Sequence, residues 1–351
     1  MFTMHDERID SVRLFCNLLI VVAHVWPFMY ISRGGWLCYF VCRSVALTAM
    51  PALFILSGYL LFRNYDSVGY KGKILSRILR LGVPLLIWNG IYIALYNLTG
   101  IVSPSAKETA MRLGVNTVSG ILSQLDPSCK LAIGPFWYVR AVLILSVAAP
   151  VYRWLYNHIH WSILLFVCLI VTIGMDNIID SHYPMYGASL FVLGGLLAHK
   201  RIDLVDWFSK MRKVLIPVGI SVLALGFIRN IYADDMSEPY GIIKFASMLV
   251  IWCCADYIHM LLNSRWVLSY MMPAGFMVYA AHMFFAQITL HSVGKSICGV
   301  HLGLVPMGLV SVTVCFCLTV LMCVVMWHLL NIICPKALAI LDGKMGLRRR
   351  K

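Results

Sequence analysis

Long apolar stretches alternate with short polar loops along this chain. A helix needs about 20 predominantly apolar residues to cross a bilayer, and loops rich in charge, glycine and proline separate windows of that length. The pattern predicts an all-α fold, a polytopic transmembrane helical bundle of about ten helices. The windows lie at roughly 12–31, 36–62, 81–98, 134–152, 161–179, 184–199, 214–231, 241–262, 275–294 and 302–333.

The composition agrees with a membrane environment. Hydrophobic residues make up 61% of the chain and charged residues 13%, and the mean hydropathy is +0.82, whereas a soluble domain is about one quarter charged. No internal repeat or soluble segment interrupts the pattern. Residues 1–351 are therefore interpreted as a single integral-membrane domain with a short basic tail, 336–351.

Lysine and arginine gather in alternate loops, which sets the expected orientation. Cytoplasmic loops accumulate these residues, so we expect both termini in the cytoplasm and the acidic residues near position 235 on the opposite side. The formal charge of +14 then reflects topology and contact with anionic lipid headgroups rather than nucleic-acid binding. The basic residues on the inner side are Arg8, Arg13, Arg63, Lys71, Lys73, Arg77, Arg80, Lys200, Arg201, Lys210, Arg212, Lys213 and Arg348–Lys351.

The cysteines and short motifs argue against several classes of site. Most of the 12 cysteines lie inside apolar windows, where a thiol behaves as a small hydrophobe. No paired CxxC set is present, so we expect no metal. The chain also lacks the GxxxxGK[ST] and GxGxxG motifs. A nucleotide-hydrolysing motor and a dinucleotide-binding fold are therefore not indicated.

Three ionisable residues fall at one depth in the outer half of the predicted bundle. His24, Arg43 and Arg140 lie roughly 9–10 Å from the outer ends of their helices. Ionisable groups at membrane depth mark functional sites, and an imidazole titrates where proton transfer needs it. The alternative is that the arginines snorkel to the outer interface and that His24 is a packing residue with its hydrogen bonds satisfied. Trp137 and Tyr138 either stack on a sugar ring or belong to an aromatic belt.

A basic face is predicted on the inner side. Arg77 and Arg80 are three residues apart and share one face of any helix entering window 81–98, with Lys73 one turn earlier. Such a face can hold phosphates through bidentate contacts. Charge that only sets the topology is the alternative interpretation.

Five segments occur in an order and helix placement that cover nearly the whole chain. They are Arg8-Ile-Asp10-Ser-Val-Arg13 followed by His24; Phe54-Ile-Leu-Ser57-Gly58; Arg77 and Arg80 before Pro84; Phe136-Trp137-Tyr138-Val-Arg140; and Phe276-Met-Val-Tyr279-Ala-Ala-His282. Together they resemble the signature series of acyltransferase family 3, the integral-membrane O-acyltransferases of bacterial surface glycans. Ala-Met50-Pro51-Ala departs from the family pattern and weakens the match of Arg43.

The resemblance implies a bacterial inner-membrane enzyme that moves an acyl group, usually acetyl, from acyl-CoA to a hydroxyl of a surface glycan or its lipid-linked precursor. It also implies that His24 is the catalytic base and that Arg13, Arg77 and Arg80 act near the donor. On this interpretation Arg43 or Arg140 stabilises the developing oxyanion or orients the acceptor. The donor's pantetheine arm would then cover the roughly 16 Å of helix between Arg13 and His24.

Other candidates have two interpretations. Ser57 could form an acyl-enzyme, but a Ser-Gly pair also lets helices pack closely, which we favour. His282, on one face with Tyr279, is expected nearer the inner side than His24, in donor binding or a structural hydrogen bond. Asp10 lies about 21 Å along the helix from His24, so no residue is identified that orients the imidazole.

The alternative function is a transporter or flippase for a glycan or a small polar solute, because buried Arg and His suit such a bundle equally well. The polar segment 103–130 is expected to help bind the acceptor. The acceptor sugar, the acyl chain length and the oligomeric state are left open.

Overall fold

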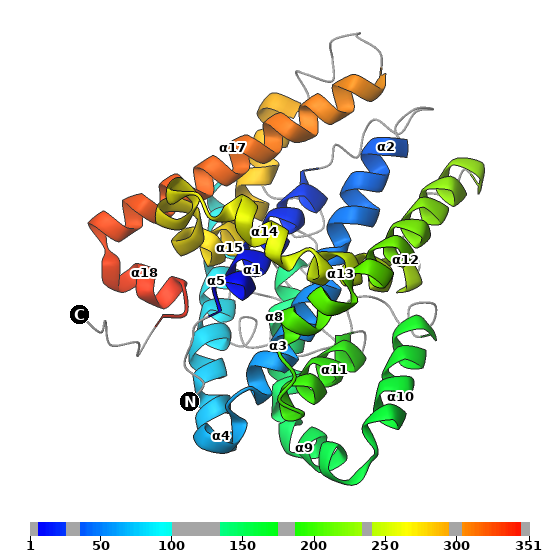
Figure 1. Cartoon of the computed structure of the whole chain (residues 1–351). Helices are drawn as coiled ribbons and strands as arrows, with labels where there is room; N and C mark the ends of the chain where they lie inside the picture. The colour runs from blue at the N-terminus through cyan, green and yellow to red at the C-terminus, as the bar shows by residue number, and fades with distance from the viewer. Residues whose placement is uncertain are drawn as a thin grey trace.

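The computed structural model describes residues 6–25, 36–99, 134–174, 187–233, 241–294 and 304–344, and these ranges hold helices and turns but no strand (Figure 1). The fold class is therefore all-α. Short π-helical turns join several α-helices into longer rods: η1 (Phe40–Val45), η3 (Ile78–Gly82), η8 (Val267–Met271) and η9 (Leu290–Gly294). The α-helices are α1 (Glu7–His24), α2 (Trp36–Tyr39), α3 (Ala49–Phe62), α4 (Tyr65–Arg77), α5 (Val83–Thr99), α8 (Trp137–Val147), α9 (Ala149–His158), α10 (Trp161–Gly174), α11 (Ala188–His199), α12 (Leu204–Ala233), α13 (Gly241–Cys253), α14 (Ala255–Leu262), α15 (Met272–Thr289), α17 (Leu304–Ile333) and α18 (Pro335–Leu341).

Several of these rods are long and apolar enough to cross a membrane. In the described ranges there are five, or up to seven if each of two bent helix pairs counts as one span. The pairs α8 with α9 and α13 with α14 bend by 58° and 59°. The chain is thus a multi-pass membrane protein, whereas the total of about ten helices and the side on which the termini lie stay predictions. The five rods are Phe40–Phe62, Tyr65–Leu95, Leu204–Arg229, Val267–Val293 and Leu309–Ile333.

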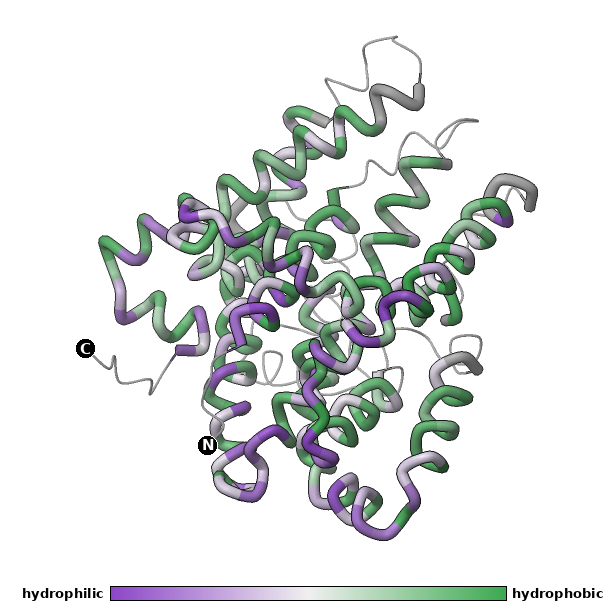
Figure 2. Tube along the Cα trace, in the orientation of Figure 1, coloured by the Kyte–Doolittle hydropathy of each residue, from purple (hydrophilic) through white to green (hydrophobic). Residues whose placement is uncertain are grey.

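The helices divide into a buried centre and an exposed periphery. In the rod that contains α3, 78% of the most apolar window is buried inside the protein, compared with 11% in the rod of α12. The exposed side chains of α12 are large and apolar, among them Val214, Val218 and Leu225, and Figure 2 colours most of this helix as hydrophobic. A long apolar surface of this kind is stable against lipid rather than water. α12 therefore lies at the lipid-facing edge.

Glycines allow the closest helix packing in the centre. A Cβ added to Gly58 of α3 would collide with the backbone carbonyl of Phe191 in α11, and one added to Gly194 of α11 would collide with the carbonyl of Ile55. Small residues let two helix backbones approach in this way in membrane proteins. The glycine of the Ser57-Gly58 pair therefore has the packing role favoured from the sequence.

Helix α1 lies among α3, α14 and α15 and carries the predicted base. It begins at Glu7, where the Asp6 carboxylate accepts a hydrogen bond from the backbone N–H of Arg8 at 3.0 Å, as expected of an N-cap. It ends at His24. The prediction that His24 lies about 9 Å inside its helix is therefore wrong, because the helical segment is shifted toward the N-terminus relative to the window 12–31. Segment 103–130 lies outside the described residues.

Candidate active site

The two imidazoles singled out from the sequence are in contact. The ring centroids of His24 and His282 are 5.1 Å apart and their planes meet edge-on at 61°. His282 is fully buried and His24 partly buried. The sequence predicted that His282 lies nearer the inner side than His24. The helical rod that carries His282, however, starts at Val267 rather than at 275. About two extra turns therefore separate His282 from the start of its rod.

Each imidazole is held by a backbone carbonyl through the same nitrogen. Nδ1 of His24 lies 2.8 Å from the carbonyl oxygen of Ile20, and Nδ1 of His282 lies 2.7 Å from that of Tyr279. A carbonyl only accepts hydrogen bonds, so in the neutral rings Nδ1 carries the proton. The lone pair of each ring is then on Nε2, the nitrogen able to accept a proton from a substrate. Nε2 of His282 is buried and has no hydrogen-bond partner among the described residues.

His24 lies in the last turn of α1, beside the terminal carbonyls of the helix. The last carbonyls of a helix carry partial negative charge, which stabilises a cation in the final turn. Earlier in α1, about two turns before His24, Asn17 Nδ2 donates to the carbonyl oxygen of Gly275 in α15 at 2.9 Å. This buried hydrogen bond fixes α1 against the helix that carries His282.

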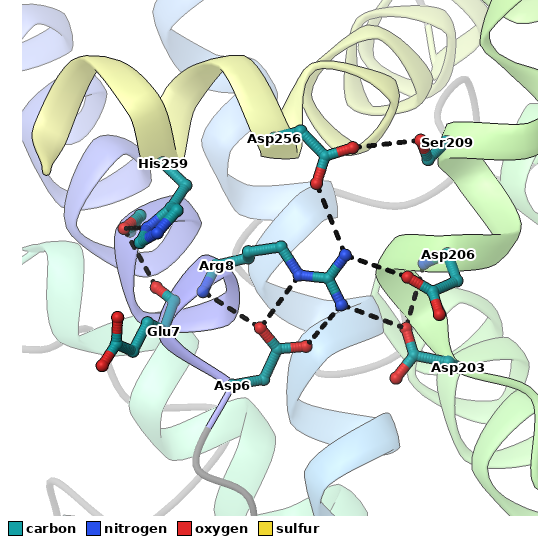
Figure 3. Close-up of polar contacts among 9 residues, drawn as sticks. Asp6, Glu7, Arg8, Asp203, Asp206, Ser209, Asp256 and His259 are labelled. Atoms are coloured by element: carbon teal, nitrogen blue, oxygen red, sulfur yellow. Dashed lines mark hydrogen bonds and ion pairs between the residues drawn. The ribbon is translucent and has the colours of Figure 1, made fainter.

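A charged cluster anchors the opposite end of α1 (Figure 3). The Arg8 guanidinium pairs with both carboxylate oxygens of Asp6 at 3.1 Å, with Asp206 at 2.9 Å and with Asp256 at 3.4 Å. Asp203 lies 4.0 Å away. Arg8 therefore ties the start of α1 to α12 and α14, which lie far away in the sequence. We call these five residues the Arg8 cluster.

The Arg8 cluster determines the charge state of Asp6. Burial raises the pKa of this carboxyl, but the hydrogen bonds and the charge of Arg8 outweigh burial, so the pKa lies below its ordinary value of 3.8. From the sequence, Arg8 is a topology-setting charge and part of the first segment of the family series, with no partner indicated. Its partners in α12 and α14 follow from tertiary contacts 198 and 248 residues apart, which no local pattern indicates.

Ser57 belongs to a hydrogen-bond network that occupies its side chain. Tyr138 Oη donates to the carbonyl oxygen of Leu53 at 3.0 Å and lies 2.6 Å from Ser57 Oγ. Because a phenol has one proton, the Ser57 hydroxyl donates to Tyr138. The Tyr138 ring also packs edge-on against Phe54, with centroids 4.9 Å apart. This network joins α3 to α8, and it is a structural role for Ser57 and Tyr138.

The two arginines of the predicted inner face point in different directions. Arg77 is partly buried, donates from Nη2 to the carbonyl oxygen of Ser57 at 2.6 Å, and lies 5.8 Å from the centroid of the Phe191 ring. Arg80 is exposed. The π-helical turn η3 starts directly after Arg77 and changes the angle between successive side chains. For this reason the spacing of three does not place both side chains on one exposed face.

The remaining arginine candidates lie in separate environments. Arg13 is exposed and forms an ion pair with Asp10 at 2.8 Å. Arg140 is 3% exposed, so it stays inside the protein and does not snorkel. For Arg43 only the backbone, in η1, is within the described structure. Trp137 is partly buried, with its ring 5.8 Å from that of Phe54.

Among the described residues, no group of three or more His, Cys, Asp or Glu side chains could hold a metal ion. The chemistry present is that of two imidazoles, a buried arginine and exposed basic residues such as Arg13 and Arg80. Such groups can move a proton and stabilise an anion.

Comparison with known proteins agrees with the resemblance found in the sequence. The model of the acyltransferase domain that defines acyltransferase family 3 matches residues 6–328, nearly the whole chain. No curated protein and no solved structure matches the chain significantly. The match includes both imidazoles, the Arg8 cluster and the arginines of α4, η3 and α8. The chain therefore belongs to acyltransferase family 3.

Proposed function

We propose that this protein transfers an acetyl group from cytoplasmic acetyl-CoA to a hydroxyl of a surface polysaccharide or its lipid-linked precursor. It would do so in the bacterial inner membrane, with both termini in the cytoplasm. The observation that carries the proposal is the held imidazole of His24, packed against His282 inside a chain of this family. Of the enzyme and transporter alternatives, the family match favours the enzyme.

In the reaction, Nε2 of His24 takes the proton of the attacking hydroxyl. The hydroxyl oxygen bonds to the thioester carbon, the carbon–sulfur bond breaks, and the CoA thiolate takes the proton back from His24. The positive charge that His24 carries between these steps forms at the C-terminal end of α1, where the helix carbonyls stabilise it. The buried guanidinium of Arg140 supplies charge for the oxyanion.

His282 acts in this mechanism by holding the base. Its ring limits the rotation of His24, and its own Nδ1–H is fixed by the carbonyl oxygen of Tyr279. Tyr279 in turn donates to the carbonyl oxygen of Pro135 at 2.5 Å. In this proposal, another imidazole rather than a carboxylate helps to orient His24.

The donor reaches this site from the basic end. Arg80 is exposed there, and its guanidinium can bind the CoA phosphates. Arg77 has a bracing role through Ser57 and also adds positive charge. From Arg13 to His24 the helix covers about 16 Å, which a pantetheine arm can span. In this proposal Trp137 belongs to the acceptor side, since an aromatic ring can stack on a sugar.

The proposal is tested by separating donor binding from transfer. With purified protein in nanodiscs, Arg80→Ala should weaken CoA binding about tenfold, whereas His24→Ala should leave binding within about twofold and abolish acyl transfer to the acceptor glycan. Arg265→Ala is the matched control, because Arg265 is also exposed but is absent from the proposed donor site. Full transfer by His24→Ala would overturn the catalytic assignment.

A further inference from the structure

The C-terminal segment, Pro335–Lys344, lies beyond the residues matched by the family model and is nevertheless built into the bundle. It comprises α18 and the turn that follows. Trp88 Nε1 of α5 donates to the carbonyl oxygen of Leu341 at 3.2 Å, and Lys344 Nζ donates to that of Pro273, at the start of α15, at 3.2 Å. We call residues 335–344 the C-terminal strap.

A buried carboxylate fixes the strap to a third helix. Asp342 is 6% exposed, and its Oδ2 accepts hydrogen bonds from Trp327 Nε1 of α17 at 2.8 Å and from Lys344 Nζ at 2.9 Å. A buried carboxylate is costly unless it is paired. The Lys344 ammonium also lies 5.6 Å from the centroid of the Trp327 ring. Asp342 is thus a specific anchor rather than an incidental surface residue.

The C-terminal strap lies directly against the backbone of Arg80. Gly343 has a φ of +64°, and a Cβ added there would collide with the carbonyl oxygen of Arg80 and lie 2.8 Å from its carbonyl carbon. A side chain at position 343 would therefore meet both backbone strain and the chain of η3. Only glycine permits this contact without displacing η3.

The turn that the strap touches is one whose geometry needs support. η3 is a π-helical turn, Ile78–Gly82, between α4 and α5, and π-helical turns inside α-helices are found frequently at functional sites. It carries Arg80, an exposed cation of the proposed donor site. Trp88 extends the contact of the strap to the next turns of α5.

We propose that the C-terminal strap is part of the donor site: Asp342 and Gly343 are positioning residues that hold η3 so that Arg80 meets the phosphates of acyl-CoA. This inference rests on the proposed function, since it assigns a residue to donor binding. It predicts that strap variants change the affinity for the donor and leave the chemical step and the acceptor site unchanged.

The test compares Gly343→Ala with Gly90→Ala in the full-length protein in nanodiscs. Gly90 lies on α5, the helix that continues from η3, and a Cβ there meets nothing within 4 Å. Gly343→Ala should raise the KM for acyl-CoA about tenfold, with kcat and the KM for the acceptor within about twofold. Gly90→Ala should leave all three unchanged. An unchanged KM for acyl-CoA in Gly343→Ala, or an equal loss in kcat, would overturn the inference.

Hydrogen exchange gives a readout that does not depend on the proposed function. Amides 78–82 of Gly343→Ala, measured without CoA, should exchange faster than those of the wild type and of Gly90→Ala. Unchanged exchange would mean that the strap does not brace η3. Faster exchange in a protein whose wild type binds no CoA would instead show that the brace exists and that the proposed function is wrong.

A second variant keeps the test valid if Gly343→Ala does not fold. Asp342→Asn preserves the shape of the side chain and the acceptor for Trp327 but removes the charge that pairs with Lys344. It should raise the KM for acyl-CoA about threefold and speed exchange at 78–82 in the same direction. A folded Asp342→Asn protein with neither change would contradict the proposal.

Discussion

The two ends of α1 use charged and ionisable groups in opposite ways. At the start, Arg8 is surrounded by carboxylates from three parts of the chain, so its charge is matched and its geometry fixed. At the end, Nδ1 of His24 lies 2.8 Å from the carbonyl oxygen of Ile20 and the ring packs against that of His282, so Nε2 is the nitrogen with the lone pair. A residue paired with several carboxylates stabilises a fold, whereas a general base needs a nitrogen whose lone pair can accept a proton. One helix thus joins an anchor to a base.

The largest effect should come from the base. His24→Gln keeps a side chain of similar size but removes a group that can accept and return a proton, so turnover should fall about 10³-fold. Thermal stability should stay close to that of the wild type, because His24 is only partly buried. Steady-state transfer and a melting curve on one preparation measure both. A loss of turnover that tracks a loss of folded protein would contradict a catalytic role.

A substitution in the Arg8 cluster should instead lower the stability more than the turnover. Arg8→Ala leaves three carboxylates within 3.4 Å of the vacated guanidinium position, so it should cost about 1–2 kcal/mol of stability, discounted because the Arg8 side chain is partly exposed. Turnover of the molecules that stay folded should fall less than about tenfold. Arg8→Lys, which keeps the charge but not the two-pronged geometry, is the matched control and should lie between. An unchanged melting temperature in Arg8→Ala would contradict the claim that Arg8 stabilises the start of α1.

Acid should affect the anchor through Asp6. Its folded-state pKa is below the ordinary value of 3.8, so the stability that Asp6 contributes is complete above that value and is lost as the pH falls through the lower, folded-state pKa. Melting temperature against pH should therefore fall below about pH 4, and Asp6→Asn should remove part of that fall. If the melting temperature of Asp6→Asn fell with decreasing pH as much as that of the wild type, Asp6 would not be the group responsible for the loss of stability in acid.

The smallest effect should come from Ser57. Its hydroxyl donates to Tyr138, so Ser57→Ala should lose one hydrogen bond, about 1 kcal/mol of stability, and keep turnover within about threefold. No acyl-enzyme should be detected by intact-protein mass spectrometry after incubation with the donor alone. An acylated peptide that contains Ser57 would overturn the direct-transfer mechanism.

Sequence patterns predicted the helices better than their contacts. Hydropathy identified the apolar rods because the cost of burying polar backbone in lipid depends on each segment alone. The series of short motifs pointed to the family because each motif lies within one short stretch of sequence and needs no tertiary contact to be found. The start of the helix carrying His282 was placed too late, at 275, because the polar residues near 265 concealed the turn η8.

The site residues could be proposed, but their geometry could not. The partners of Arg8 come from α12 and α14, and the contact of His282 with His24 joins residues 258 positions apart. The divergence of Arg77 from Arg80 depends on a π-helical turn that helical periodicity does not include. The contact of Gly343 with Arg80 depends on the path of the C-terminal strap, which a lone glycine does not reveal.

The most direct test of the central claim is mass spectrometry of the surface glycans from cells that carry the wild-type gene, no gene, or the His24→Ala gene at equal protein levels. The account predicts an added acetyl mass on the glycan in the wild type and its loss in the other two. Acetylated glycan in His24→Ala cells at the wild-type level, or the same glycan mass with and without the gene, would contradict it.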